Sequence, residues 1–244
     1  MTQWQGKRYW LVGASDGLGA ALAQRLSTAG AEVILSARSV DKLQQVADAL
    51  PGKVSVVPMD VADTSSVATA AAAVGDVDGV VHLAGVCFPF KAQKWNAEQA
   101  IEMADVNFTG LIRLMGEVVP KMVKKDDGHI VITSSLSAFR GLPGMIGYGA
   151  SKAGVMSLAE SMYADLRKTG VKVQVVNPGY IKTQMTANNK FPMPSIMEVD
   201  DAAREIFEHM NTDRFKKSFP FGLSSLLRAS QFMPDGLYYR IFGK

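Results

Sequence analysis

The 244-residue sequence predicts an α/β protein of one domain (residues 1–244), built as a doubly wound parallel sheet with helices on both faces. Short apolar runs alternate with longer stretches of helical pattern, as in chains that build a parallel sheet. Several runs are near-continuous in Val, Ile and Leu, which is typical of strands covered on both faces. Right-handed crossovers between such strands produce the doubly wound arrangement.

Six runs predict buried strands: Tyr9–Val12, Glu32–Ala37, Val54–Met59, Gly79–Leu83, His129–Thr133 and Val171–Asn177. Helical stretches lie near residues 17–29, 40–49, 64–74, 96–124 and 148–169. Gly30 and Gly170 each follow a helix, where a residue in the left-handed conformation commonly ends it. The pattern becomes irregular after about residue 180.

Composition excludes several other classes of protein. With 48% hydrophobic residues and a net charge of +3, the chain is not a disordered protein. Its single cysteine, Cys87, excludes a disulfide scaffold. No apolar run approaches the roughly 18 residues of a membrane-spanning helix, and we recognise no signal peptide at the start of the chain. We therefore expect a cytoplasmic protein, and we expect no metal site.

The basic excess is concentrated in a C-terminal extension, residues 213–244, which carries six basic and two acidic side chains. Nucleic-acid binding would need a larger basic face, so we expect no such partner. The extension is also rich in aromatic residues. It predicts either subunit packing or one wall of the substrate pocket, or else a weak contact with an anionic membrane surface.

Ligands of a doubly wound sheet bind beyond the carboxyl ends of its strands, so the residues there are the candidate site. The first strand is followed by a glycine-rich turn that opens a helix and spans Gly13, Ala14, Ser15, Asp16, Gly17, Leu18 and Gly19. Glycines allow the backbone to turn tightly and to approach a pyrophosphate at the helix N-terminus. The same turn also matches GxSxG, the nucleophile elbow of serine hydrolases, with Ser15 as nucleophile.

The second strand ends at Arg38, where a dinucleotide site needs a group that contacts the adenosine ribose. A guanidinium suits the 2′-phosphate of NADP(H), which we therefore favour over NAD(H). Asp60 and Val61 follow the third strand and are placed to meet the adenine. Asp60 could instead cap the helix that begins near Asp63.

The fifth strand leads to Ser135, and a helix beginning at Tyr148 carries Lys152 four residues later, on the same helix face. A nearby ammonium group lowers the pKa of a phenol, which is otherwise near 10. Tyr148 could then exchange a proton with a substrate whose carbonyl Ser135 polarises.

These motifs, in this order, resemble the short-chain dehydrogenase/reductase family in its single-domain, NADP-preferring branch, from residue 7 to about residue 183. The resemblance implies a Rossmann fold and hydride transfer between a nicotinamide cofactor and a carbonyl or alcohol carbon. It implies that Tyr148 is the acid/base, that Lys152 also holds the nicotinamide ribose, and that Asn107 holds the water of a proton relay. Further cofactor contacts are implied for Ala84, Gly85, Pro178, Gly179, Ile181 and Thr183.

The chain departs from the usual family pattern at Val12, at His82 and Leu83, and in its C-terminal ending. None of these departures affects the residues that the family uses for catalysis. Residues 184–200, rich in Met and Pro, predict a lid over an apolar substrate. The family also implies a homodimer or homotetramer. The leading hypothesis is an NADP(H)-dependent oxidoreductase; the alternatives are a catalytically silent NADP-binding regulator and a serine hydrolase.

Overall fold

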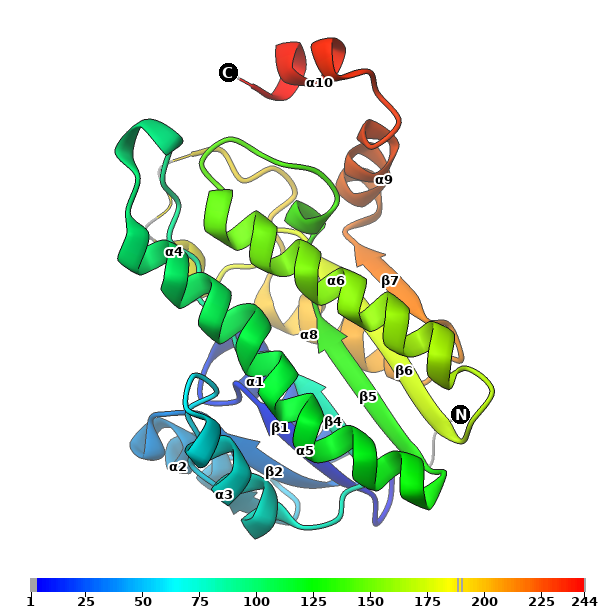
Figure 1. The fold of residues 1–244 in the computed structure, drawn as a ribbon. Helices are drawn as coiled ribbons and strands as arrows, with labels where there is room; N and C mark the ends of the chain where they lie inside the picture. The colour runs from blue at the N-terminus through cyan, green and yellow to red at the C-terminus, as the bar shows by residue number, and fades with distance from the viewer. Residues whose placement is uncertain (1–3, 188, 190, 244) are drawn as a thin grey trace.

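Seven parallel strands form one sheet in the computed structural model, in the order β3-β2-β1-β4-β5-β6-β7 (Figure 1). The structure describes residues 4–187, 189 and 191–243. The strands are β1 (Arg8–Val12), β2 (Glu32–Ser36), β3 (Val54–Val56), β4 (Gly79–His82), β5 (Gly128–Thr133), β6 (Val171–Pro178) and β7 (Lys216–Phe219). The order reverses between β1 and β4, so the sheet is doubly wound, as predicted.

Helices cover both faces of this sheet (Figure 1). One face packs on α1 (Gly17–Thr28), α2 (Val40–Asp48) and α8 (Val199–Met210), with Leu22, Leu43 and Ile206 in its core. The other packs on α3 (Thr64–Val74), α5 (Gly110–Lys125) and α6 (Ile146–Leu166), with Leu114 and Val155 in its core. Each central strand is therefore buried on both sides, which explains its continuous apolar sequence.

The remaining helices lie near the loops: α4 (Ala97–Ala104), α7 (Gln184–Ala187), α9 (Phe221–Ser230) and α10 (Asp235–Phe242). Short 3₁₀ turns occupy Ala92–Lys94 and Leu136–Ala138. The helical stretch predicted near 96–124 is confirmed as one run from Ala97 to Lys125, in which a π-helical turn at Asp105–Thr109 joins α4 to α5. Such a turn inserts one residue into a helix and shifts the phase of the apolar positions across it, while each side keeps its own helical period, so the stretch is still recognised as helix.

The prediction of six strands missed β7, and the position of this strand at the sheet edge is the reason. β7 pairs only with β6, at the edge of the sheet, and its sequence begins with Lys216 and Lys217. Lys216 pairs with Glu160 of α6, and Lys217 pairs with Glu205 of α8 at 2.7 Å. An edge strand that uses its side chains for ion pairs lacks the apolar run by which strands were predicted.

The two glycines expected to end helices differ from each other. Gly30 has φ +96°, so the prediction of a left-handed residue after α1 is confirmed. Gly170 lies outside that region, and the prediction is wrong there. A Cβ at Gly170 would lie 1.8 Å from the carbonyl oxygen of Asp126, so glycine is required by a close approach of two backbones.

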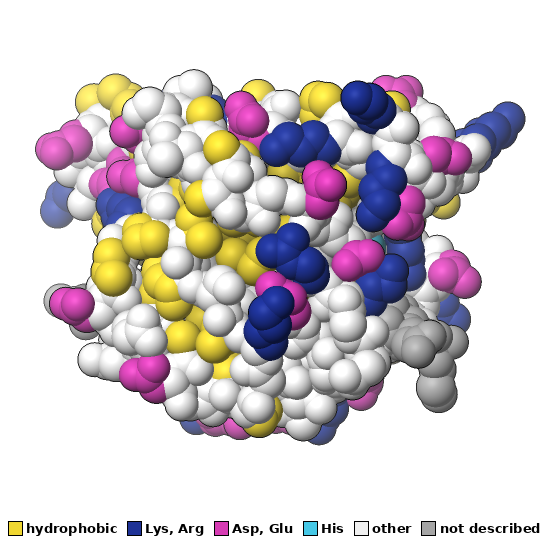
Figure 2. All heavy atoms as spheres, turned by 90° about the horizontal axis from the view of Figure 1, so that it is seen from below, with side chains coloured by type: hydrophobic (Ala, Val, Ile, Leu, Met, Phe, Trp, Pro, Cys, Tyr) yellow, Lys and Arg dark blue, Asp and Glu magenta, His cyan; other side chains and the backbone are white. Residues whose placement is uncertain are grey.

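The amino ends of the strands lie at the edge of the sheet opposite the predicted site. Lys7 pairs with Asp78 at 2.8 Å there, and Arg8 and Lys53 both pair with Glu32. The face seen from below interleaves basic and acidic side chains (Figure 2). The described residues of that face therefore form no extended basic surface. Among the described residues, no helix is long and apolar enough to cross a membrane.

Candidate active site

A pocket of about 910 Å³ opens at the carboxyl ends of the strands. It brings together nearly all the residues predicted from the strand ends, which come from distant parts of the sequence. The predicted residues that line it are Gly13, Ser15, Asp16, Gly17, Leu18, Gly19, Arg38, Asp60, Val61, Ala84, Gly85, Ser135, Tyr148, Lys152, Pro178, Gly179, Ile181 and Thr183. Asn107 is not among the lining residues; it is fully buried behind them.

The glycine-rich turn is closely packed at two positions and left-handed at two. A Cβ at Gly19 would lie 2.0 Å from the carbonyl oxygen of Gly13, and one at Gly13 would lie 2.5 Å from the backbone nitrogen of Ala84. Gly13 and Gly17 have φ of +93° and +50°. Only glycine fits such positions without strain, and the result is a bare backbone surface at the N-terminus of α1.

Two basic side chains from the end of β2 and the start of α2 line the pocket at its nucleotide end. Arg38 is exposed and forms no ion pair among the described residues. Lys42, which the sequence analysis did not single out, lies 3.8 Å from the carboxylate of Asp16, the N-cap residue of α1. A second basic residue four positions after Arg38 is the signal that could have revealed it.

Asp60 shapes the loop after β3. The alternative role proposed for it, capping of the next helix, belongs to Asp63. Its carboxylate accepts a hydrogen bond from the backbone N–H of Ala62 at 2.9 Å. Asp63 is the N-cap of α3 and accepts from the N–H of Ser65 at 2.8 Å. Asp60 is therefore not the helix cap, and it lines the pocket.

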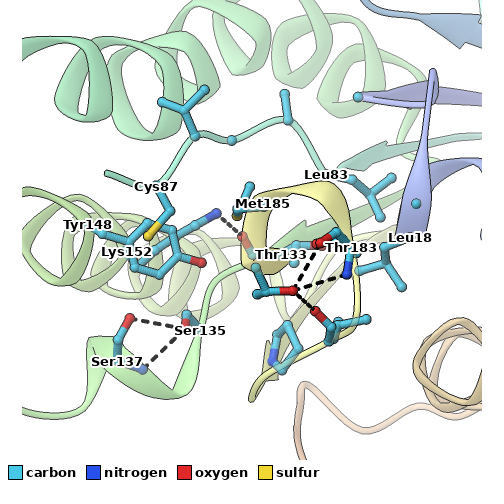
Figure 3. Close-up of a pocket in the computed structure, with 18 of the residues that line it drawn as sticks. Leu18, Leu83, Cys87, Thr133, Ser135, Ser137, Tyr148, Lys152, Thr183 and Met185 are labelled. Carbon is cyan, nitrogen blue, oxygen red and sulfur yellow. Dashed lines mark hydrogen bonds between the residues drawn. The ribbon is translucent and has the colours of Figure 1, made fainter. Parts of the chain in front are cut away.

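The side chains of Tyr148 and Lys152 project from α6 toward the end of β5, with Cys87 beside them (Figure 3). The Nζ atom of Lys152 lies 5.9 Å from the centre of the Tyr148 ring and donates a hydrogen bond to the carbonyl oxygen of Thr133 at 2.9 Å. Ser135 lies opposite, where its hydroxyl accepts hydrogen bonds from the N–H and O–H of Ser137 at 3.2 and 3.0 Å.

Burial has the largest effect on the pKa values of these groups. It raises the pKa of the Tyr148 phenol, and the nearby Ser135 hydroxyl acts in the opposite direction. The expected lowering of this pKa by Lys152 is not seen. Burial lowers the pKa of the Lys152 ammonium to about 8 and raises the pKa of the Cys87 thiol to about 11. At neutral pH the phenol is thus a proton donor, and the thiol is uncharged.

Asn107 lies in the π-helical turn between α4 and α5 and ties that turn to the strand end after β4. Its amide nitrogen donates to the carbonyl of Val86 at 2.9 Å, and its amide oxygen accepts from the N–H of Val86 at 2.7 Å. The nitrogen also donates to the Ser151 hydroxyl at 3.0 Å. A Cβ at Gly85 would lie 3.1 Å from the Asn107 amide oxygen and 3.5 Å from the Lys152 Nζ, so both groups flank the same backbone.

The far end of the pocket is apolar, and the C-terminal extension lines part of it, which was one of the alternatives predicted; Leu142, Met145 and Tyr180 were not predicted. Leu142 and Met145 precede α6, Tyr180 follows β6, and Leu223, Leu227, Ile241 and Phe242 come from α9 and α10. From the predicted lid, residues 184–200, the pocket is lined by Gln184, Met185, Thr186, Asn189, Pro192 and Pro194. Residues 188 and 190 of that segment lie outside the described residues.

No histidine lies with Ser15 in the pocket, as a serine hydrolase would require. His82 is fully buried within β4. His129 bonds to the hydroxyl of Tyr9 at 2.9 Å and to the amide oxygen of Gln174 at 2.8 Å, near the opposite edge of the sheet. His209 lies near the end of α8. The hydrolase hypothesis therefore has no base for its nucleophile.

Comparison with known proteins finds similar chains and similar structures. An uncharacterized oxidoreductase of Myxococcus xanthus (strain DK1622) is 37% identical over 235 residues, 93% of each chain. A short chain dehydrogenase from Burkholderia cenocepacia J2315, solved in complex with NADP, is 26% identical with TM-score 0.87, covering 98% of this chain and 99% of that one. A short chain dehydrogenase/reductase from Burkholderia phymatum, in complex with NAD, shares the fold at 24% identity, with TM-score 0.86 and coverage of 93% and 94%.

The family model described as short chain dehydrogenase matches residues 7–192. That span includes the glycine-rich turn, the π-helical turn with Asn107, and the segment from Ser135 to Lys152. The chain therefore belongs to the short chain dehydrogenase family of oxidoreductases.

Proposed function

We propose that the protein is an NADP(H)-dependent oxidoreductase that transfers a hydride between the nicotinamide and the carbonyl or alcohol carbon of an apolar substrate. The observation that carries this proposal is the convergence of Ser135, Tyr148 and Lys152 in one pocket with a bare glycine turn. The turn fits a dinucleotide, because glycine at positions 13 and 19 permits its tight backbone packing and Gly17, with φ +50°, opens α1 at the pocket without a side chain. When bound, the cofactor supplies or accepts the hydride.

The protein's residues would supply the proton and hold the substrate. Tyr148 stays protonated at neutral pH because it is buried, so it can give its proton to the oxygen of a carbonyl that is being reduced. The Ser135 hydroxyl would hold that oxygen. Lys152, a buried ammonium beside the phenol, would stabilise the phenolate that remains and contact the nicotinamide ribose. Asn107 would hold the water through which Tyr148 is reprotonated.

Arg38 and Lys42 support NADP(H) as the preferred cofactor. Both line the nucleotide end of the pocket, and no carboxylate follows β2 to accept from the ribose hydroxyls. The Burkholderia cenocepacia relative was solved with NADP. A guanidinium and an ammonium together suit a 2′-phosphate.

An apolar substrate is supported by the far end of the pocket. The charged residues that line the pocket are Asp16, Arg38, Lys42, Asp60 and Lys152, all at the nucleotide end or at the proposed catalytic centre. Residues 184–200 would form a lid, and the extension over residues 213–244 would supply the opposite wall through Leu227 and Ile241. A charged substrate would lose its hydration there without a partner.

The decisive experiment measures oxidation of NADPH and NADH with aldehydes and ketones graded by chain length and ring size. We expect turnover that prefers NADPH, rises with apolar size and falls at least about a thousandfold in Tyr148→Phe, because general acid catalysis contributes on that order. The variant should still bind NADPH. Tight NADPH binding without turnover of any substrate would contradict the enzyme and favour a cofactor-sensing regulator.

Exchange of residues 184–200 for those of a relative should change substrate selectivity if they form the lid.

We further propose a homodimer or homotetramer in which α4 and α5 meet their copies. Ile101 and Ile112 project from these helices and are 68% and 44% exposed. Burial of such residues between copies would remove apolar surface from water. Light scattering of the purified protein measures the mass, and Ile101→Glu should lower it to that of a monomer.

A further inference from the structure

The C-terminal helices present a set of large apolar side chains to solvent. Phe221 at the start of α9 is 85% exposed, and Phe232 in the turn after it is 87% exposed. The other members, which are between 48% and 56% exposed, are Leu226, Leu237, Tyr239 and Ile241. They lie on more than one side of the two helices, since Tyr239 is two positions from both Leu237 and Ile241; together we call these six residues the C-terminal apolar face. Figure 1 shows α9 and α10 beyond the carboxyl ends of the strands, at one end of the molecule.

The buried side of α9 is only partly apolar, since its buried residues are Ser224, Leu227 and Ser230. Ser224 and Ser230 are buried, and their hydroxyls donate to the carbonyls of Phe221 and Leu227 at 3.0 and 2.7 Å. Two small polar side chains thus share the inner face with Leu227, while Phe221 and Leu226 of the same helix are exposed. An exposed apolar set of this size marks a surface that contacts a non-aqueous partner.

Positive charge accompanies this face. Arg228 lies seven residues after Phe221 on α9, and Arg240 lies three residues after Leu237 on α10, so each shares a helix side with an apolar residue of the face. Neither arginine forms an ion pair with any described residue. The acidic residue of α10, Asp235, is engaged by Arg140. The partner should therefore be apolar and anionic.

A second copy of the chain meets that requirement poorly. A two-fold interface in which this face met its own copy would gather Arg228 and Arg240 from both chains, and the one acidic residue of α9 and α10, Asp235, is already paired with Arg140. An anionic lipid surface combines negative headgroups with apolar chains and satisfies both halves of the face.

We propose that the C-terminal apolar face docks on anionic lipid membranes, with Phe221 and Phe232 entering the lipid and Arg228 and Arg240 contacting headgroups. Ile241 belongs both to this face and to the pocket lining, and its neighbour Phe242 also lines the pocket. The pocket mouth would then open at the lipid surface. Delivery of an apolar substrate by this route rests on the proposed function, whereas docking itself does not.

The test is flotation of the full-length protein with vesicles of phosphatidylcholine alone and with vesicles that contain equal parts of phosphatidylcholine and phosphatidylglycerol. We expect binding to the anionic vesicles that weakens as salt rises. Each of Phe221→Ser and Phe232→Ser should lower the partition coefficient about tenfold. Each of Arg228→Gln and Arg240→Gln should lower it about fivefold and reduce its salt dependence.

Val123→Ser and Lys124→Gln are matched controls, because both residues are exposed on α5, far from the face. They should leave vesicle binding unchanged, and thermal unfolding should show all the variants to be folded. NADPH oxidation with a water-soluble substrate is followed in parallel, so that a failure of docking is distinguished from a failure of the enzyme. Absence of binding to either vesicle would overturn the proposal, and so would equal binding by Phe232→Ser. A fall in molecular mass in Phe232→Ser without vesicle binding would identify a second copy as the partner.

Discussion

Arg38 and Lys42 bring two positive charges to the nucleotide end of the pocket, and each can be removed without disturbing the core. We predict that Arg38→Gln raises the KM for NADPH about tenfold, because a charge-assisted contact to a phosphate is lost, and leaves the KM for NADH unchanged. Lys42→Gln should act in the same direction. Steady-state kinetics with both cofactors measures the effect, with Lys124→Gln as control. An equal rise for both cofactors would show that these residues do not recognise the 2′-phosphate.

The Asn107 side chain has a structural role, through its hydrogen bonds to Val86, and a proposed role in the proton relay. Asn107→Ala removes both hydrogen bonds to Val86, and we predict a loss of about 2 kcal/mol in the free energy of unfolding together with slower turnover. Ser151→Ala keeps both hydrogen bonds to Val86 and removes the one that Asn107 donates to Ser151, together with the one that Ser151 donates to the carbonyl of Tyr148, and it should slow turnover less. Urea unfolding and kinetics of the two variants give the comparison. If Asn107→Ala kept full activity, its part in a proton relay would be excluded.

The residues of the nucleotide end were predictable from sequence because each directly follows a strand. Gly13, Arg38 and Asp60 occupy such positions, and parallel strands bring their carboxyl ends to one edge. Residues of the apolar end were not predictable in this way. Leu142 and Met145 reach the pocket from a loop whose course no local pattern specifies, and the C-terminal extension was predicted as a pocket wall only as one of several alternatives. The dominance of burial over the Lys152 charge at Tyr148 depends on the three-dimensional environment.

Among the helices, α10 is fastened to the loop between Ser135 and Tyr148 through Arg140. The Arg140 guanidinium donates to the carbonyl of Met233 at 2.8 Å, pairs with Asp235 and stacks 3.9 Å from the centre of the Tyr238 ring. Tyr238 in turn donates to the carbonyl of Gly141 at 2.8 Å. One arginine thus couples the C-terminal wall of the pocket to the loop that carries Leu142 and Met145.

We predict that Arg140→Ala increases amide hydrogen exchange over residues 231–242 about tenfold, since the lost contacts hold α10 locally. The KM for the largest apolar substrates should rise, while thermal unfolding of the whole protein changes little. Arg204→Ala, on the outer side of α8, is the control. Unchanged exchange in Arg140→Ala would mean that α10 is held by its apolar contacts alone.

Among the helices and strands, the sequence predicts the elements that follow the regular apolar pattern and misses those that depart from it. Six strands and the helices between them follow from periodicity, because each buries a continuous apolar face. The seventh strand escapes because Lys216 and Lys217 form ion pairs at a sheet edge. The identity of residue 170 was a correct sign of a special position, but the cause was close contact with Asp126 rather than a left-handed turn.

Over the whole molecule, every histidine is buried, and this couples folding to pH. Burial lowers the pKa of His82 to about 3 and that of His129 to about 4, and His209 is lowered in the same direction. In the unfolded chain the histidines have a pKa near 6.5. Below that pH the unfolded chain therefore binds more protons than the folded protein. Stability is therefore present above pH 6.5 and is lost as the pH falls.

We predict that His82 and His129 each lower the free energy of unfolding by about 2 kcal/mol as the pH falls from 6.5 to 5, at about 1.4 kcal/mol per pH unit. Urea unfolding at both pH values measures it. His82→Leu removes a side chain that has no hydrogen-bond partner in the structure, and it should lower the pH dependence by the share of one histidine. The same pH dependence in His82→Leu and the wild type would show that His82 titrates normally in the folded protein.

The π-helical turn at Asp105–Thr109 has a consequence for how this fold can change during evolution. A turn of this kind equals an α-helix with one inserted residue, so removal of one residue would restore a regular helix without altering the phase of α5 against the sheet. Leu111 and Leu114 would keep their places in the core. Asn107 would retract from Val86. A single-codon deletion here could thus disable the proposed proton relay while preserving the scaffold, a short mutational path from an enzyme to a binding protein.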